Sequence, residues 1–255
     1  MPHAKLQRMK VVAVIPARLA STRLPRKMLR EIAGEPLLAW VYQGARKCAA
    51  LDEVVVATDS DEIVRFCQQR GFAARMTSAA HRSGTERAHE ISTVMAADVY
   101  LNIQGDEPLT RPEHIESLLA VMRTPGVEVG TLKTPAAEID INNPSAVKVV
   151  TDSMGRALYF SRATIPFDRD GAKPRYYKHL GLYAHTKSAL DKFVSWPESF
   201  LERTERLEQL RFLENGVPIY VEETPFDTVG VDTEEDVRRV EEILRLQKSE
   251  VRSQK

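Results

Sequence analysis

The sequence predicts an α/β fold with a doubly wound, mostly parallel sheet. Short apolar segments rich in β-branched residues alternate with amphipathic segments that begin at capping residues and end at glycine. This alternation continues over roughly the first half of the chain, and such βαβ units need right-handed crossovers onto one sheet. With 255 residues, of which 43% are hydrophobic, the chain is long enough for one large domain that carries a smaller lobe.

Local signals define the predicted elements of the first half. A strand at 11–15 stops at Pro16, and Pro36 begins a helix at its first helical position. Capping oxygens at 58–60 begin the next helix, which Gly71 ends. After the first strand, further strands are predicted at 53–57, 72–76 and 98–103. Helices are predicted at 36–48, 61–70, 85–95 and 112–123.

The pattern changes in the second half, which we interpret as a smaller lobe of hairpin and helices. From Ala146 the order is strand, turn at 152–155 and strand, which predicts a β-hairpin. A loop rich in proline and charge at 166–178 leads into a strand through Tyr183, and Thr233 caps a final charged helix. The remaining predicted elements are helices at 187–194 and 202–215 and a strand at 217–222.

The composition favours small-molecule chemistry. Thirty-six basic and thirty-six acidic residues cancel, which removes the non-specific attraction that nucleic acids and anionic membranes exploit. We therefore expect neither a nucleic-acid partner nor membrane insertion. The segment MPHAKLQRMK leads directly into the first strand without a signal-peptide pattern, so we expect a cytoplasmic protein. Cys48 and Cys67 form no CxxC pair, which predicts two reduced thiols in the core.

A cationic loop follows the first predicted strand. Between residues 17 and 27 it carries no acidic residue and four cations, namely Arg18, Arg23, Arg26 and Lys27. Ligands of open α/β sheets bind outside the carboxyl ends of the strands, so this loop is placed to bind a triphosphate. It contains neither GxxxxGK[ST] nor GxGxxG, so side-chain charge would hold the phosphates. The alternative is a solvated basic turn, although such turns usually mix both signs.

Two acidic segments are candidates for a metal site. QGDEP at 104–108 follows the fourth strand, where Asp106 is placed to hold a divalent ion that bridges phosphate oxygens, and Gly105 permits close approach of the backbone. GVDT at 230–233 offers a second carboxylate, Asp232. The alternatives are an acidic surface turn for the first segment and a helix cap for the second.

Eight segments together carry a resemblance to a known family. In the family's order they are IPARLASTRLPRK, HRSGTERAHE, NIQGDEP, NPSAVKVV, ALYFSRATIPFDRD, KHLGLYA, LEQLR and GVDTEED. Between Ile15 and Asp236 the chain resembles 3-deoxy-manno-octulosonate cytidylyltransferases, also called CMP-Kdo synthetases. The resemblance implies a nucleotide-diphospho-sugar-transferase type of fold, as a single α/β domain over 1–255 with a sugar-binding and dimerisation lobe at about 140–225.

The resemblance also implies an activity. It is the Mg2+-dependent transfer of CMP from CTP to the anomeric hydroxyl of Kdo, with release of pyrophosphate, for lipopolysaccharide biosynthesis by a homodimer. The hydroxyl would attack the α-phosphorus in line, without a covalent enzyme intermediate. No side chain stands out in the sequence as a general base, and metal coordination of the hydroxyl is an alternative way to lower its pKa.

Site residues follow from the resemblance by position. Arg18, Lys27 and Asp106 would be catalytic, and Asp106 and Asp232 would bind the metal. The nucleotide would be held by Arg18, Ser21, Arg23, Lys27, Ser83, Gly84, Thr85, Arg87 and Gln104. The sugar would be held by Arg162, His179, Tyr183, Glu205, Glu208 and Gln209, with Arg162 suited to its carboxylate. Without the resemblance, the histidine and the two glutamates would be interpreted as a strand residue and a solvated helix face.

Two other functions remain open at this point. One is the same chemistry with a different acceptor, either an amino analogue of Kdo or another 2-keto sugar acid. The other is a nucleotide-binding protein without catalysis. The paired carboxylates and Lys27 argue against the second, because binding alone does not need all three.

The chain departs from the family pattern in the cationic loop. Where the family has LPGKP, this chain reads LPRKM, so that Arg26 replaces a glycine and Met28 a proline. Glycine at this position permits a positive φ, which costs other residues roughly 1–2 kcal/mol. Either Arg26 adopts the strained conformation or the loop follows a different path.

Overall fold

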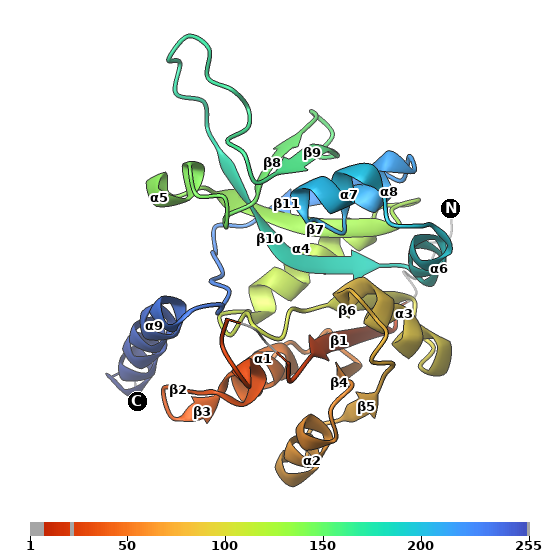
Figure 1. Ribbon diagram of the computed structural model, residues 1–255, viewed down its shortest axis with the longest axis vertical. Helices are drawn as coiled ribbons and strands as arrows, with labels where there is room; N and C mark the ends of the chain where they lie inside the picture. Colours follow the sequence, from red (N-terminus) through yellow and green to blue (C-terminus); the bar gives the residue numbers. More distant parts are fainter. Residues whose placement is uncertain (1–7, 21–22, 254–255) are drawn as a thin grey trace, which may run out of the picture.

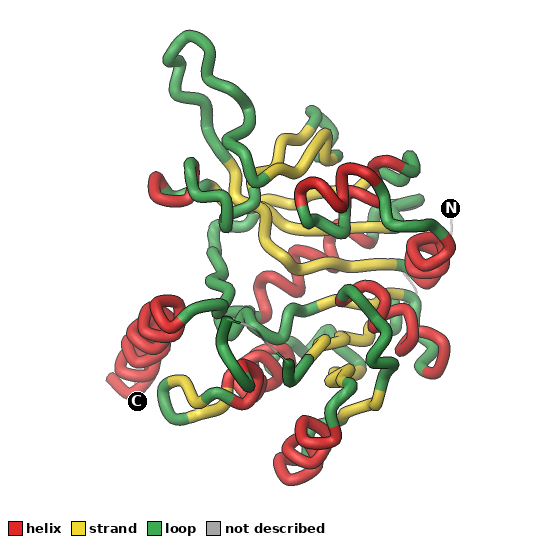
Figure 2. Tube along the Cα trace, viewed as in Figure 1, coloured by secondary structure: helices red, strands yellow, loops and turns green. Residues whose placement is uncertain are grey.

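A mixed sheet forms the centre of the computed structural model, which describes residues 8–20 and 23–253, with side chains through residue 246. Only β10 runs antiparallel to its neighbours in the main strand order, and the other neighbouring strands pair in parallel. The order is β11 (Ile219–Glu223), β7 (Val129–Pro135), β10 (Tyr177–His185), β6 (Val99–Asn102), β1 (Val11–Ala17), β4 (Glu53–Thr58) and β5 (Ala74–Met76) (Figures 1 and 2).

Helices cover both faces of this sheet. Val11, Ala13 and Ile15 of β1 pack towards α1 (Leu37–Arg46), α2 (Asp61–Arg70) and α4 (Pro112–Met122). Val12 and Val14 point the other way and pack against α3 (Gly84–Val94) and α6 (Lys187–Ser195). Because successive side chains of a strand alternate between faces, the continuous apolar run at 11–15 needs both layers. The predicted doubly wound, mostly parallel fold is therefore confirmed.

A second hydrophobic core forms in the second half of the chain. The hairpin of β8 (Lys148–Thr151) and β9 (Ala157–Ser161) joins the sheet through β10. Phe160 of β9, Phe193 of α6 and Phe212 pack together in this core. The other helices of this half are α5 (Glu138–Ile141), α7 (Phe200–Glu205) and α8 (Leu210–Glu214). A long loop between β9 and β10 projects away from the rest of the molecule (Figure 1).

The C-terminal helix is packed against the segment that follows the cationic loop. Val237, Val240 and Leu244 of α9 (Glu234–Ser253) contact an apolar cluster that includes Leu24 and Ile32. The elements of that segment are η1 (Lys27–Leu29), β2 (Glu31–Ile32) and β3 (Glu35–Pro36). The first and last parts of the chain thus share one small core beside the carboxyl ends of the strands.

Three local predictions were wrong. No strand was predicted at β7, whose Gly130 weakens the strand pattern; that glycine is needed because a Cβ there would lie 3.2 Å from Cγ1 of Val121. Pro36 precedes α1 as an extended residue instead of opening it. The helix predicted at 202–215 is broken into α7 and α8, because Arg206 adopts the left-handed conformation with φ 56°.

The cysteine prediction is confirmed. Cys48 and Cys67 are both free and buried, and burial raises the pKa of the Cys67 thiol to about 11. Of the helices in the described part of the chain, none is long and apolar enough to span a bilayer.

Candidate active site

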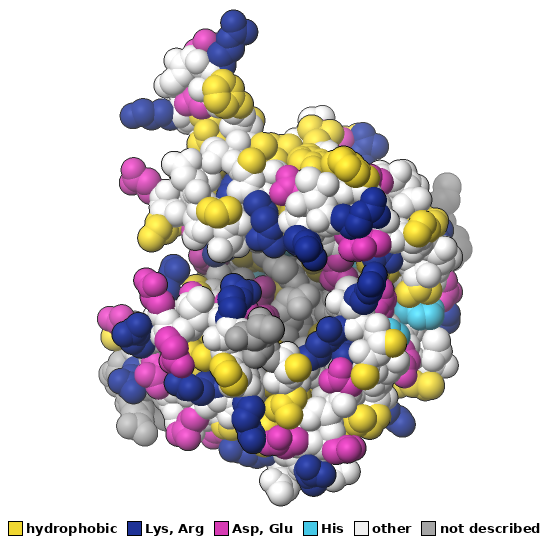
Figure 3. All heavy atoms as spheres, viewed as in Figure 1, with side chains coloured by type: hydrophobic (Ala, Val, Ile, Leu, Met, Phe, Trp, Pro, Cys, Tyr) yellow, Lys and Arg dark blue, Asp and Glu magenta, His cyan; other side chains and the backbone are white. Residues whose placement is uncertain are grey.

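A cleft of about 380 Å³ lies at the carboxyl ends of β1 and β6. Arg18 lines it, and its Nη2 atom is buried without a hydrogen-bond partner among the described residues. A buried guanidinium nitrogen without a partner indicates that an anion belongs there. We call this site the cationic cleft, and its lining residues are Pro16, Arg18, Ala20, Arg23, Lys27, Met28, Arg82, Ser83, Gly84, Arg87, Gln104, Gly105, Asp106 and Asp232. Figure 3 shows basic side chains around the hollow in the centre of this face.

Two glycines bring the walls of the cationic cleft close together. A Cβ atom on Gly105 would lie 2.6 Å from the backbone oxygen of Pro16, and one on Gly84 would lie 2.8 Å from Nδ2 of Asn102. A larger residue at either position would push backbone or a buried amide aside. The glycine of the QGDEP segment therefore has the role of close approach that the sequence predicts.

Lys27 joins the two carboxylates that the sequence singles out. Its Nζ atom lies 2.6 Å from Oδ2 of Asp106 and 2.9 Å from Oδ1 of Asp232, and its side chain is only 9% exposed. Arg23 pairs with the other oxygen of Asp232 at 2.9 Å. Residues far apart in sequence thus meet at one cluster of opposite charges.

The charges of this cluster support one another. Burial alone would lower the pKa of Lys27, but attraction and hydrogen bonds from Asp106 and Asp232 outweigh it and raise that pKa above its usual range. Burial alone would raise the pKa of Asp232, but Lys27 and Arg23 bring it below its usual range. Lys27 and Asp232 are therefore both charged at neutral pH, as a phosphate or metal site requires.

The loop before α9 aims Asp232 at this cluster. The backbone N–H of Val231 donates to the Asp106 carbonyl at 2.9 Å, which ties the loop to the QGDEP turn. Thr233, rather than Asp232, caps the helix by accepting from the Asp236 N–H at 3.2 Å. The Asp236 carboxylate in turn accepts from the backbone N–H groups of Asp232 and Thr233. The Asp232 side chain is therefore free of a capping role.

The start of α3 forms the opposite wall of the cationic cleft. Ser83 Oγ caps the helix by accepting from the Glu86 N–H at 3.2 Å. Arg87 lines the cleft but its guanidinium is held by Thr77 Oγ1 at 2.5 Å and by Asp59 at 2.7 Å. The structure places Ser83, Gly84, Arg87 and Gln104 in the lining of the cleft, with Thr85 buried beside them.

A second cavity of about 390 Å³ meets the cationic cleft. The two share three residues, which are Arg23, Asp106 and Asp232. We call it the acidic cavity because five carboxylates line it, against three basic side chains. Its other lining residues are Glu107, Asp140, Asn143, Ser145, Ala146, Val147, Lys178, His179, Gly181, Thr228, Val229, Gly230, Thr233, Asp236 and Arg239. The carboxylate pair therefore stands where two compartments of similar size join.

Two of the predicted sugar residues, His179 and Tyr183, are buried in or beside the acidic cavity. His179 lines it, lies 3.0 Å from Thr131 Oγ1 through Nε2, and contacts the Tyr183 ring. Burial lowers the pKa of His179 to about 3, so the ring is neutral. Gln209 is also buried, with no hydrogen-bond partner for its Nε2 atom in the part of the chain that the structure describes. These groups can exchange hydrogen bonds with hydroxyls.

Arg162 and Glu205 line neither cavity. The Arg162 guanidinium donates to the backbone carbonyls of Glu205 at 2.8 Å, Pro144 at 3.0 Å and Arg206 at 3.4 Å. The Glu205 carboxylate accepts from Ser161 Oγ at 2.6 Å and from the Arg162 N–H at 3.0 Å. The pair fastens β9 to the end of α7, and its contact with a sugar stays a prediction.

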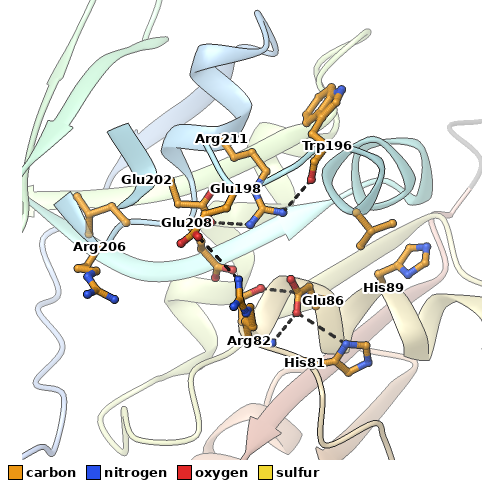
Figure 4. Close-up of a pocket in the computed structure, with 13 residues that line it drawn as sticks. His81, Arg82, Glu86, His89, Trp196, Glu198, Glu202, Arg206, Glu208 and Arg211 are labelled. Carbon is orange, nitrogen blue, oxygen red and sulfur yellow. Dashed lines mark hydrogen bonds and ion pairs between the residues drawn. The ribbon is translucent and has the colours of Figure 1, made fainter. Parts of the chain in front are cut away.

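Glu208 lines a third cavity of about 480 Å³ between α3 and α7 (Figure 4). Burial raises the pKa of Glu208, although hydrogen bonds from Ser83 and Thr85 oppose the shift. Ion pairs cross this cavity, including the buried pair of Arg211 and Glu202 at 2.6 Å. Glu208 thus lines a different cavity from His179, although its charge reaches Tyr183, whose ring lies beside that histidine.

Two residues of the acidic cavity were missed from the sequence. Burial, aided by the charge of Asp106, raises the pKa of Glu107 to about 7. Lys178 donates to Asp227 at 2.8 Å and to the Thr228 carbonyl at 3.0 Å. Glu107 follows Asp106 and Lys178 precedes His179 in the sequence, and this adjacency was the only signal that could have identified the two residues. A glutamate in a turn and a lysine in a strand are otherwise ordinary.

The departure at position 26 has a clear structural outcome. Arg26 adopts the left-handed conformation, with φ 55° and ψ 31°, and pairs with Glu62. Of the two alternatives given by the sequence, a strained Arg26 or a different path of the loop, the structure therefore shows the strained Arg26. Ser21, assigned to the nucleotide, lies outside the described residues.

Comparisons with known proteins agree with this architecture. A cytidylyltransferase family model matches residues 12–223. The chain is 62% identical over 245 residues to the 3-deoxy-manno-octulosonate cytidylyltransferase of Koribacter versatilis, covering 96% of this chain and 94% of the relative. It is 57% identical over 235 residues to the protein of the same name from Acidobacterium capsulatum, covering 92% of this chain and 96% of that relative.

A solved structure of CMP:2-keto-3-deoxy-manno-octonic acid synthetase complexed with CTP superposes with a TM-score of 0.89 at 42% identity. The match covers 93% of this chain and 99% of the other. Sequence and fold agree over almost the full length of both proteins. The chain therefore belongs to the 3-deoxy-manno-octulosonate cytidylyltransferase family.

Proposed function

We propose that this protein transfers CMP from CTP to the anomeric hydroxyl of Kdo and releases pyrophosphate. The observation that carries the proposal is the junction of the cationic cleft and the acidic cavity at Asp106, Asp232 and Arg23. A nucleotidyl transfer needs a site for a polyanion, a site for an acceptor, and charged groups between them. Family membership identifies the two substrates as CTP and Kdo.

The cationic cleft supplies the nucleotide site. Arg18, Arg23 and Lys27 are placed to contact the triphosphate, and the buried unpartnered nitrogen of Arg18 gains an acceptor when a phosphate oxygen arrives. Ser83 and Arg87 lie on the opposite wall, where the cytosine and ribose would be held. Lys27 neutralises charge on the pyrophosphate as it leaves, because its ammonium already lies at the junction.

Asp106 and Asp232 fit a magnesium ion. A single ammonium contacts a carboxylate oxygen of each, at 2.6 and 2.9 Å, so the two side chains converge on one cation. Two carboxylates suffice, since magnesium takes its other ligands from phosphates and water. When bound, the ion would neutralise phosphate charge and lower the pKa of the attacking hydroxyl.

The remaining residues orient the acceptor. In the transfer, the hydroxyl oxygen forms a bond to the α-phosphorus, the bond from that phosphorus to the β-phosphate oxygen breaks, and the hydroxyl proton passes to solvent. Neutral His179 and buried Gln209 hydrogen-bond sugar hydroxyls. Their burial keeps the acceptor in one orientation, which in-line attack requires.

We further propose a homodimer that works in the cytoplasm in lipopolysaccharide biosynthesis. The lobe at about 140–225 is the candidate for subunit contacts, because it carries exposed apolar side chains, among them Leu158, Phe167 and Phe200. Light scattering on the purified protein should give twice the 28.7 kDa of one chain. A mass of one chain would contradict the dimer without touching the activity.

A pyrophosphate-release assay tests the function. CTP is incubated with Kdo, an amino analogue of Kdo or N-acetylneuraminate, with Mg2+ or with EDTA, and the product is identified by mass spectrometry. We expect kcat/KM to be highest for Kdo and turnover to vanish in EDTA. Preference for the amino analogue would change the acceptor but keep the chemistry. CTP binding without turnover of any acid would contradict catalysis.

A further inference from the structure

The acidic cavity contains one basic side chain that is not yet paired. Arg23 is bound by Asp232 at 2.9 Å, and Lys178 by Asp227 at 2.8 Å and by the Thr228 carbonyl. Arg239 of α9 also lines the cavity, and in the described part of the chain its side chain makes no hydrogen bond or ion pair. It is therefore the cation that is free to meet a ligand.

Arg239 lines the same cavity as the carboxylate pair of Asp106 and Asp232. Asp236 lies on the same face of the helix, three residues earlier, and its carboxylate binds the backbone N–H of Asp232 at 3.0 Å. One helical turn is about 5.4 Å long, which is within the reach of an arginine side chain. Arg238 belongs to another face, where its Nε donates to the Glu234 carbonyl at 3.3 Å and it lines a separate surface hollow with Glu242.

The chemistry of the acceptor defines what this cation would contact. In a 2-keto sugar acid the anomeric carbon carries both the attacking hydroxyl and the carboxylate. The carboxylate must therefore lie beside the reacting oxygen, at the end of the acidic cavity where Asp106 and Asp232 stand. An anion that enters among five carboxylates needs a cation at that end. Arg162 does not reach it, since its guanidinium is bound to three backbone carbonyls.

We propose that Arg239 binds the carboxylate of the sugar acid and thereby contributes to the selection of 2-keto acids as acceptors. The proposal rests on the function given above. It assigns a substrate contact to the C-terminal helix, whose apolar face is anchored against the segment after the cationic loop through Val237 and Val240. The anchored helix therefore fixes the Arg239 backbone beside the acidic cavity.

Steady-state kinetics of Arg239→Ala test the proposal. We expect the KM for Kdo to rise about tenfold, in the range for loss of a partly exposed charge pair, with the KM for CTP and kcat within about twofold of wild type. Arg239→Lys should recover part of the loss. Arg238→Ala is the matched control, because it removes the same charge from the same helix outside the cavity, and its KM values should not change.

A ligand comparison separates contact from mere structural support. Competition binding of Kdo and its C1 carboxamide should show that the preference for the carboxylate shrinks about tenfold in Arg239→Ala and stays unchanged in Arg238→Ala. An unchanged preference, an unchanged KM for Kdo, or an equal rise in the KM for CTP would overturn the assignment. If the wild-type chain turns over no Kdo at all, the proposed function falls together with it.

Discussion

The cationic cleft and the acidic cavity are built in different ways. Most of the cationic cleft comes from three short stretches, at 16–28 apart from the undescribed residues 21 and 22, at 82–87 and at 104–106; the first begins at the end of β1 and the last follows β6. The acidic cavity collects residues from widely separated segments, mainly 140–147, 178–181 and 228–239. The difference fits the ligands that we propose for the two compartments: charge at the end of a strand is enough to attract phosphates, whereas a sugar needs several polar groups in fixed orientations.

Buried charge is also treated differently in the two compartments. In the cationic cleft, Lys27 is buried but bound by two carboxylates. In the acidic cavity, Glu107 is buried beside Asp106, with no hydrogen-bond partner for its Oε2 atom among the described residues. Pairing offsets the desolvation cost of a buried charge, whereas an unpaired buried charge reduces stability and is retained where a ligand or reaction uses it.

The largest expected effect is at Asp106, one of the three residues that both compartments share. Asp106→Asn should lower turnover at least ~100-fold, because an electrostatic group next to the reacting phosphate is lost, while KM values for both substrates change less. Stopped pyrophosphate assays measure turnover, and circular dichroism checks the fold. Asp170→Asn, on the exposed loop between β9 and β10, is the control. Turnover near wild type would remove Asp106 from the reaction.

Glu107 provides a pH test of the acidic cavity. Its pKa is about 7 in the fold against a usual value near 4.5, so the folded state keeps the proton longer and stability is lost as the pH rises through this range. Glu107→Gln should therefore match wild type at pH 5 and be more stable at pH 8, by up to about 3 kcal/mol. Urea unfolding at both pH values measures this difference.

Exposed Glu116 of α4 is the control for that pH test. Glu116→Gln should leave the difference between the two pH values as it is in wild type. A Glu107→Gln variant with the same pH dependence as wild type would show that the carboxyl is ionised without a cost in the fold.

Arg162 tests whether the lobe acts as a scaffold or as a binding surface. Arg162→Ala leaves three backbone carbonyls without a donor, so the free energy of unfolding should fall by about 1–3 kcal/mol. Arg162→Lys should lose nearly as much stability, since an ammonium lacks the planar fork. If Arg162→Lys keeps wild-type stability, the carbonyl contacts contribute little. A KM for Kdo that rises in Arg162→Ala but not in Arg162→Lys would support the predicted sugar contact.

The smallest effect is expected at Arg26 in the cationic cleft's loop. Arg26→Gly relieves the left-handed strain, worth roughly 1–2 kcal/mol, but removes the exposed pair with Glu62, which contributes at most about 1 kcal/mol. Turnover should stay within a few-fold, and the KM for CTP should rise modestly at low salt and hardly at high salt. A large, salt-independent loss of turnover would place Arg26 in contact with the reacting groups.

Local sequence determined the parallel strands β6, β1, β4 and β5 of the main sheet and much of the cationic cleft. The β-branched run at 11–15, the capping residues and the glycines act over a few residues, so their consequences are readable without knowledge of distant partners. The proximity of Lys27 and Asp106 was also predictable from sequence. Both residues follow predicted strands of a parallel sheet, and the carboxyl ends of such strands lie at one edge. The identity of the sugar residues came from the resemblance of eight segments and not from local chemistry.

Tertiary structure alone decided how the second half converges. Packing of Gly130 against α4 made a strand of β7, and the left-handed Arg206 split one expected helix into two. Arg162 was assigned to the sugar but its guanidinium binds backbone carbonyls, while Arg239, on a helix that the sequence marks only as charged, lines the acidic cavity. Such outcomes depend on which distant groups compete for a side chain, and that competition is settled only when the chain is folded.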